Sequence, residues 1–247
     1  MARILILGAT SAIAAEVAQI YARRSDRLHL VGRSPVKLAE VASRCLQAQT
    51  VTTQIADLSQ LDANEGVIAH AVATLGGVDL ALIAHGELGD QQKSEGSFGA
   101  AESILRTNFL SVVSLLIPLA NEMERAQCGR LGVITSVAGD RGRPRNYTYG
   151  AAKGATAIYL QGLRTRLYRS GVTVTTLKLG PVDTPMTRDH RKHLLFGKPA
   201  KVADAIVHAL EAGIAEAYVP SFWRALMPLV KNTPERLFQR LSFLSGR

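Results

Sequence analysis

Short apolar runs alternate with segments of helical periodicity along most of this 247-residue chain. Each run is followed by small or polar turn residues. Strands that alternate with helices in this way form a parallel sheet with helices packed on both faces. We therefore predict an α/β fold with a doubly wound parallel sheet. The predicted strands are Arg3–Leu7, Leu28–Val31, Val51–Ile55, Val78–Ala84, Leu131–Thr135, Val172–Lys178 and Glu216–Val219.

The helical segments and the composition favour one domain. Apolar residues make up 47% of the chain, enough for a sizeable core. We predict a dinucleotide-binding catalytic domain over residues 1–220 and a basic, hydrophobic tail of the same domain over 221–247. Pro118 suggests a kink or break in the longest helix. The predicted helices are Ile13–Arg24, Ser59–Leu75, Phe98–Arg125, Tyr147–Arg169 and Val202–Ala212.

A serine, a tyrosine and a lysine form the strongest chemical pattern. Tyr149 and Lys153 are four residues apart, which places them on one face of a helix. A phenol has a pKa of about 10, and an adjacent ammonium is expected to lower it. Ser136, at the end of a predicted strand, could hold a carbonyl oxygen. This set predicts proton transfer in carbonyl or alcohol chemistry.

The first strand leads into a turn that suits a phosphate. Gly8, Thr10 and Ser11 form the turn, Ser11 could cap the next helix, and Ile13 begins that helix. Free backbone N–H groups and the helix dipole would then face an anion. An ordinary strand-to-helix turn has the same pattern.

The ends of the next strands indicate the cofactor. Arg33 stands where an acidic residue would bind the 2′-hydroxyl of NAD, which favours NADP(H), with NAD(H) as the alternative. Asp57, followed by Leu58, could bind the adenine amino group or cap the helix after it. Gly86 follows the fourth strand and could let backbone approach a cofactor. We predict no metal site, because His85 has no Cys, His or carboxylate cluster around it.

Together these residues resemble the short-chain dehydrogenase/reductase family over nearly the whole chain. The resemblance rests on Ser136, Tyr149, Lys153, Asn108, the Gly8 turn, Asp57 and the Gly180–Thr184 turn. It implies a Rossmann-type fold, with Tyr149 as general acid, Ser136 on the carbonyl and Lys153 on the nicotinamide ribose. It also implies that Asn108 helps a water-borne proton relay. Pro181, Val182 and Thr184 would contact the nicotinamide end, and pairing through the long helices would give a homodimer or homotetramer.

Two features depart from the family pattern. Ala12 and Ala14 replace glycines of the glycine-rich turn, and Ala84-His85-Gly86 replaces Asn-Ala-Gly. The alanine methyl groups would reduce the room near a pyrophosphate. A narrower resemblance links Ile83–Gln91, residues 136–153 and Tyr218–Leu241 to reductases of decaprenylphosphoryl-2-keto-pentose. Those enzymes serve cell-wall arabinan synthesis.

Three arginines lie between the serine and the tyrosine. Arg141, Arg143 and Arg145 could clamp a phosphate of the substrate, or could make structural hydrogen bonds within their loop. A second basic stretch follows the last turn and is a candidate for a mobile lid. Its bases are Arg188, Arg191, Lys192, Lys198 and Lys201, against the single acid Asp189.

The tail and the net charge of +9 favour an anionic partner. Apolar residues with Trp223 alternate with five bases and one acid over residues 222–247. This suits peripheral contact with an anionic membrane, or packing on a neighbouring subunit. We expect Pro228 and Pro234 to break the tail into short helices. Aromatic content is 5% and no nucleic-acid motif occurs, so no nucleic-acid partner is expected.

The sequence thus predicts an oxidoreductase that reduces a ketone to a secondary alcohol with NAD(P)H. The favoured substrate is a keto-sugar on a polyprenyl phosphate. Alternatives are a soluble ketone or 3-oxoacyl substrate, and a nucleotide-binding sensor without catalysis. The two cysteines do not form a disulfide framework, and no apolar run of membrane-spanning length is found. We expect a cytoplasmic protein, peripheral to the inner face of the plasma membrane if the tail binds lipid.

Overall fold

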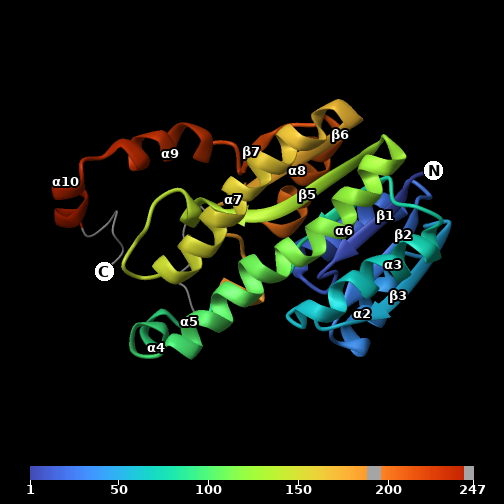
Figure 1. The fold of residues 1–247 in the computed structure, drawn as a ribbon, viewed down its shortest axis with the longest axis horizontal. Helices are drawn as coiled ribbons and strands as arrows, with labels where there is room; N and C mark the ends of the chain where they lie inside the picture. The colour runs from blue at the N-terminus through green and yellow to red at the C-terminus, as the bar shows by residue number, and fades with distance from the viewer. Residues whose placement is uncertain (188–195, 242–247) are drawn as a thin grey trace.

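The computed structural model describes residues 1–187 and 196–241. Its strands form a single parallel sheet in the order β3-β2-β1-β4-β5-β6-β7, which confirms the predicted α/β fold (Figure 1). The order reverses between β1 and β4, and this is the point where ligands bind in open α/β sheets. The strands are β1 Arg3–Leu7, β2 Arg27–Gly32, β3 Thr50–Ile55, β4 Leu80–Ile83, β5 Gly129–Ser136, β6 Val172–Leu179 and β7 Glu216–Val219.

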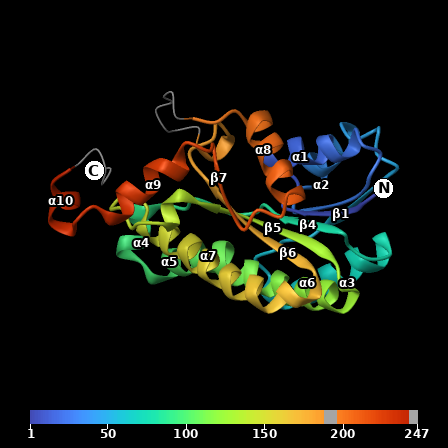
Figure 2. The same ribbon diagram turned by 90° about the horizontal axis from the view of Figure 1, so that it is seen from above.

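Helices cover the two faces of the sheet in separate layers (Figure 2). One layer contains α1 (Ala12–Ala22), α2 (Pro35–Ser43) and α8 (Pro199–Glu211), and it buries the first core cluster. The other contains α3 (Asn64–Leu75), α6 (Ser111–Ala126) and α7 (Tyr147–Leu167), and it buries the second cluster. Central strands β1 and β4 are buried on both faces, as their nearly uninterrupted apolar sequences require.

Local signals set the starts of the helices near the cavity. Ser11 caps α1 by accepting a hydrogen bond from the Ala14 N–H at 3.2 Å. Ser34 caps α2 in the same way, and Pro35 occupies its first turn. Asp57 accepts hydrogen bonds from the N–H and hydroxyl of Ser59. The helix predicted from Ser59 begins later, because a short 3₁₀ turn at Leu61–Ala63 precedes α3.

The longest helix is continuous from Phe98 to Ala126. It contains α5 (Phe98–Leu105), a π-helical segment (Arg106–Leu110) and α6. Of the predicted kink or break at Pro118, the break is wrong, since Pro118 lies inside α6. The irregularity is the π segment instead. Length and apolar composition alone would let this helix cross a membrane, but α6 packs against α3 and α7 on the sheet.

The tail forms two helices, α9 (Trp223–Asn232) and α10 (Glu235–Arg240), beyond the carboxyl end of the sheet (Figure 1). Pro234 separates them, but Pro228 lies inside α9, so the predicted break there is wrong. Their inward side chains pack on Val137, which follows β5, and form a third core cluster. The tail is thereby attached to the loop that follows Ser136. The buried residues of the cluster are Val137, Trp223, Met227, Val230 and Phe238.

Candidate active site

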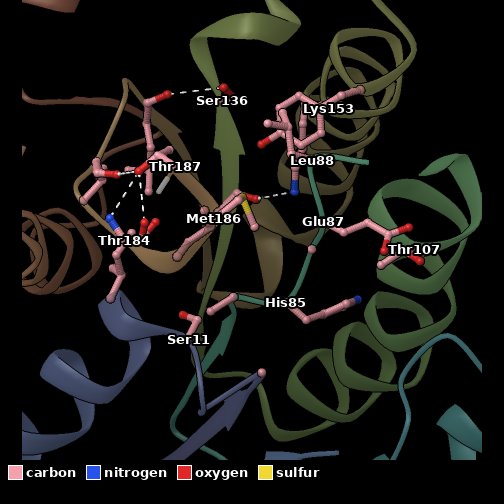
Figure 3. Close-up of a pocket in the computed structure, with 18 of the residues that line it drawn as sticks. Ser11, His85, Glu87, Leu88, Thr107, Ser136, Lys153, Thr184, Met186 and Thr187 are labelled. Atoms are coloured by element: carbon pink, nitrogen blue, oxygen red, sulfur yellow. Dashed lines mark hydrogen bonds between the residues drawn. The ribbon is translucent and has the colours of Figure 1, made fainter. Parts of the chain in front are cut away.

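A cavity of about 730 Å³ lies at the carboxyl ends of the strands. Residues from the turns after β1, β2, β3, β4, β5 and β6 line it, as does Trp223 of α9. Figure 3 shows Ser136 and Lys153 above, Ser11 and His85 below, and Thr184 at the left between them. Its size suits a dinucleotide together with part of a substrate.

Every residue predicted to bind the cofactor lines this cavity. They come from segments far apart in the sequence, and the parallel sheet brings them to one edge. The residues are Gly8, Thr10, Ser11, Ile13, Arg33, Asp57, Leu58, Gly86, Tyr149, Lys153, Pro181, Val182 and Thr184.

The turn after β1 fits a dinucleotide phosphate. Gly8 has φ +81°, and a Cβ there would lie 2.5 Å from the backbone nitrogen of His85. Glycine is therefore required by both conformation and space. The first N–H groups of α1 point out of the helix beside this turn. Of the two alanines that replace glycines, Ala12 borders the cavity, whereas Ala14 is fully buried in the core and does not narrow it.

Two basic side chains, Arg33 and Lys37, line the cavity near the carboxyl end of β2. Arg33 is exposed and lines the cavity there, and Lys37 of α2 lines it as well. Hydrogen bonds from Ser59, assisted by the charge of Arg33, hold the pKa of Asp57 below its usual value. The carboxylate is thus already bound by Ser59, and it also borders the cavity. The arrangement of Arg33 and Lys37 suits an additional phosphate.

Ser136 ends β5 and presents its hydroxyl to the cavity. Its Oγ accepts a hydrogen bond from the Ala138 N–H at 3.1 Å and donates to the Leu179 carbonyl at 3.4 Å. The second bond is long and therefore weak. The hydroxyl proton can turn from Leu179 toward a substrate oxygen at small cost.

Lys153 and Tyr149 lie together on α7, as their spacing predicted. The Lys153 Nζ is 5.8 Å from the centre of the Tyr149 ring and donates to the Ile134 carbonyl at 3.1 Å. Burial lowers the pKa of Lys153 to about 8. Burial raises the pKa of Tyr149 to about 12, against the opposing hydrogen bond with Ser136. The expected lowering of the Tyr149 pKa is wrong for this structure, because desolvation outweighs the lowering by the hydrogen bond with Ser136.

Asn108 is fully buried in the π segment and does not line the cavity. Its Nδ2 donates to the Glu87 carbonyl at 2.8 Å and to the Ile104 carbonyl at 2.9 Å, and its Oδ1 accepts from the Glu87 N–H. The geometry therefore makes Asn108 a positioning residue for the loop that follows Gly86. The proton-relay role implied by the resemblance stays a prediction.

The three arginines have different environments. Arg141 lies outside the cavity and donates to the carbonyls of Val230, Lys231 and Thr233. Its hydrogen bonds are therefore structural, and the predicted contact with the substrate is wrong for this arginine. Arg143 and Arg145 both line the cavity. Arg188, Asp189, Arg191 and Lys192 of the predicted lid lie outside the described residues. Lys198 and Lys201 are exposed at the start of α8.

The sequence did not assign a site role to two ring side chains of the cavity, the half-buried His85 and the buried Trp223. His85 is held by Ser111 Oγ at 2.7 Å from its Nε2, and burial, assisted by Lys153, lowers its pKa to about 3. Trp223 belongs to α9 of the tail, and its ring packs directly on Gly180. A Cβ on Gly180 would lie only 2.0 Å from the indole Nε1. His85 could have been found from its place directly after β4. No local signal links Trp223 to Gly180, because only the fold joins them.

The family model for short-chain dehydrogenases matches residues 2–195. The chain therefore belongs to the short-chain dehydrogenase family, whose members are oxidoreductases that bind NAD(P)H. An uncharacterized oxidoreductase of Mycobacterium tuberculosis is 33% identical over 242 residues, which cover 97% of each chain. An uncharacterized oxidoreductase of Streptomyces coelicolor is 32% identical and covers 96% of this chain and 95% of its own.

Solved structures share the fold at low sequence identity. Levodione reductase superposes with a TM-score of 0.79 at 20% identity, covering 87% of this chain and 93% of its own. A variant of actinorhodin polyketide ketoreductase with NADPH gives a TM-score of 0.77 at 20% identity, covering 88% and 94%. At these identities the likeness concerns the fold alone.

Proposed function

We propose that this protein reduces a ketone to a secondary alcohol by hydride transfer from NADPH. One observation carries the proposal: Ser136, Tyr149 and Lys153 border the same cavity as the phosphate-binding turn of Gly8 and the Gly180–Thr184 turn. A sensor that only binds nucleotide would not need a proton donor at that place.

The residues have distinct roles in this reaction. When bound, the reduced nicotinamide supplies the hydride. Ser136 donates a hydrogen bond to the ketone oxygen and stabilises the charge that develops on it. Tyr149, whose pKa is about 12, is protonated at neutral pH and donates its proton to that oxygen. Lys153 has donors beyond its bond to Ile134, and these can orient a ribose hydroxyl.

The NADP(H) preference is supported by Arg33 and Lys37 at the β2 end of the cavity. A 2′-phosphate there would meet two cations, whereas the 2′-hydroxyl of NAD finds no acidic residue directly after β2. NAD(H) remains the alternative cofactor.

The test is NADPH oxidation by the purified protein with a panel of ketones, and Tyr149→Phe is the matched control. We expect turnover that falls about 10²- to 10⁴-fold in the variant, with NADPH affinity retained. Equal rates in the two proteins would contradict the proposed role of Tyr149. Tight NADPH binding without turnover of any ketone would favour the sensor alternative.

Within this activity the narrower proposal is a keto-sugar on a polyprenyl phosphate. It is supported by the resemblance of the three segments described above and by two arginines that border the cavity, Arg143 and Arg145. Soluble ketones and 3-oxoacyl substrates are the alternative. Comparing a polyprenylphosphoryl 2-keto-pentose in detergent with soluble ketones distinguishes them, since turnover of soluble ketones alone would remove the lipid-linked substrate.

We further propose that the chain forms a homodimer or homotetramer through α6 and α7. Exposed apolar side chains on these helices support this, namely Ile117, which is 48% exposed, and Ile158, which is 70% exposed. Light scattering after size-exclusion chromatography tests it with Ile158→Asp. A wild-type protein that is monomeric at micromolar concentration would contradict the proposal.

The tail supports a proposal of peripheral contact with anionic lipid by a cytoplasmic protein. Its inner face is used in packing, but Phe222, Leu229 and Leu237 are exposed beside bases such as Arg224 and Lys231. Flotation with anionic and neutral vesicles tests it. We expect binding to anionic vesicles that Leu229→Glu weakens; equal flotation of both proteins, or none, would contradict the proposal.

A further inference from the structure

Arg143 is a buried cation in the wall of the cavity. It is 9% exposed, and it borders both the active-site cavity and a neighbouring hollow beside Phe238. Within the described part of the chain, its guanidinium makes one hydrogen bond, to the Met227 Sδ at 4.0 Å, and no ion pair. A buried guanidinium without a carboxylate is costly unless another anion completes its environment.

Carboxylates around Arg143 are already engaged by other groups, including Glu95 of the neighbouring hollow, which accepts a hydrogen bond from Gln91. Asp140, in the same loop, pairs with Lys178 at 2.9 Å and accepts from the Tyr218 hydroxyl at 2.6 Å. Glu87 also lines the cavity, but its carboxylate accepts from Ser103, and its side chain extends toward Thr107 in Figure 3. Burial and the adjacent Arg145 lower the pKa of Arg143, although the charge of Asp140 acts in the opposite direction.

Arg143 is also held in place. Arg141, two residues earlier, bonds to the carbonyls at the end of α9 and stacks on the Phe238 ring at 4.1 Å. Met227 of α9, fully buried, lies against Arg143 itself. The tail therefore fixes the loop and keeps Arg143 directed inward, so the cation is preorganised for a ligand.

The indole N–H of Trp223 is a second donor without a partner within residues 1–187 and 196–241, and it lies one helical turn from Met227, the residue that contacts Arg143. Trp223 precedes Met227 by four residues on α9, and its buried Nε1 has no hydrogen-bond partner among the described residues. Trp223 lines the cavity beside Gly180, near the predicted nicotinamide end. A buried indole N–H normally finds an acceptor. Two unsatisfied donors of this kind suit a ligand rich in acceptor oxygens.

We propose that Arg143 and the Trp223 N–H form a subsite for an oxyanion carried by the ketone substrate, a phosphate or a carboxylate. This deepens, and rests on, the proposed ketone reduction. The cavity places the subsite beside Tyr149, so it sets which ketones bind productively. Arg143 also borders the neighbouring hollow, which leaves room for a substrate that continues past its anionic group.

Binding is measured by calorimetry on protein saturated with NADP⁺, where a ketone cannot be reduced. The probes are two matched pairs: D-xylulose 5-phosphate with D-xylulose, and 4-oxopentanoate with 2-pentanone. We expect the anionic member of at least one pair to bind at least tenfold more tightly, and the preference to weaken with salt. The pair that shows it identifies phosphate or carboxylate as the group. No preference in either pair overturns the proposal.

Variants then assign the preference to its residues. Arg143→Met should abolish it while affinity for the neutral probes stays within twofold, and Arg143→Lys should retain part of it. Trp223→Phe, which keeps the ring but removes the N–H, should weaken only the anionic probes, by a few-fold. Arg125→Met, which removes an exposed cation from α6, is the matched control and should change nothing.

A preference that persists in Arg143→Met overturns the role of Arg143. An equal loss for anionic and neutral probes in Trp223→Phe overturns the role of the N–H. The proposed reductase activity is judged separately, by NADPH oxidation with the same probes. Selective binding without turnover would support the subsite and contradict the proposed reaction. Turnover without selective binding would support the reaction and contradict the subsite.

Discussion

The cofactor end and the substrate end of the cavity are built in different ways. At the cofactor end, the walls come from the turns after three strands: Gly8 after β1, Arg33 after β2 and Asp57 after β3. At the substrate end, the walls come from the loop after β5 and from α9 of the tail, which meet only through tertiary packing. Local sequence therefore specifies the first end, and long-range contacts specify the second. Substitutions should affect one end without the other.

Removing the Ser136 hydroxyl should have the largest effect. Ser136→Ala takes away the donor to the developing oxyanion, and we expect kcat to fall about 10²- to 10³-fold. The Kd for NADPH should change little. The unfolding midpoint should fall slightly, because the variant loses the hydrogen bond from the Ala138 N–H as well as the long bond to Leu179. Steady-state kinetics measure kcat, and fluorescence titration measures the Kd for NADPH. A parallel loss of NADPH affinity would show that the two ends are not separable.

His85 lies between the two ends and should make stability depend on pH. The pKa of His85 is about 3 in the folded protein, against an ordinary value of 6.5. Between these two pH values the unfolded state binds a proton and the folded state does not. The contribution of neutral His85 to the free energy of unfolding is fully present above pH 6.5. It is lost as the pH falls toward 3, by about 1.4 kcal/mol per pH unit. Urea unfolding at pH 7, 6 and 5 should show this slope.

The control for His85 is His85→Asn, which cannot titrate in this range. We expect a flatter dependence of unfolding free energy on pH in the variant than in the wild type. If both proteins lose stability equally between pH 6 and 5, carboxylates elsewhere account for the acid sensitivity and His85 does not.

Arg33 should affect the cofactor end alone. Arg33→Ala removes a charge-assisted contact to a 2′-phosphate, and the ratio of kcat/KM for NADPH to that for NADH should fall about tenfold or more. Lys37→Ala, at the same end, is the comparison and should have an effect in the same direction. An unchanged ratio in both variants would remove the basis for NADP(H) preference.

Arg141 should give the smallest effect, confined to the substrate end. Arg141→Met removes its bonds to the tail carbonyls and its ion pair with Glu235 at 2.7 Å. We expect faster hydrogen exchange in α9 and α10, a KM for ketone raised about two- to fivefold at a cost of roughly 1 kcal/mol, and unchanged NADPH affinity. Exchange that accelerates near Gly8 as well would contradict the separation of the two ends.

The sequence predicted the sheet well because its signals are local, and for the same reason the residues that it assigned to the cofactor line one cavity. Apolar runs specify buried strands, and residues at strand ends must converge in a parallel sheet. It failed where tertiary context competes with a local preference. Pro118 and Pro228 are tolerated inside helices, and the helix expected from Ser59 begins later. The helical spacing of Tyr149 and Lys153 was predicted, but the direction of the Tyr149 pKa shift was not, because burial cannot be read from spacing.

The sequence by itself determined the succession of the seven strands, the spacing of Ser136, Tyr149 and Lys153, and the residues of the turn after β1. These depend on interactions between near neighbours. Only the tertiary structure decided that Arg141 binds the tail, that Arg143 is buried in the cavity wall, and that Trp223 reaches Gly180. Burial and contact across such sequence distances depend on how the layers pack, and no local pattern of residues encodes that.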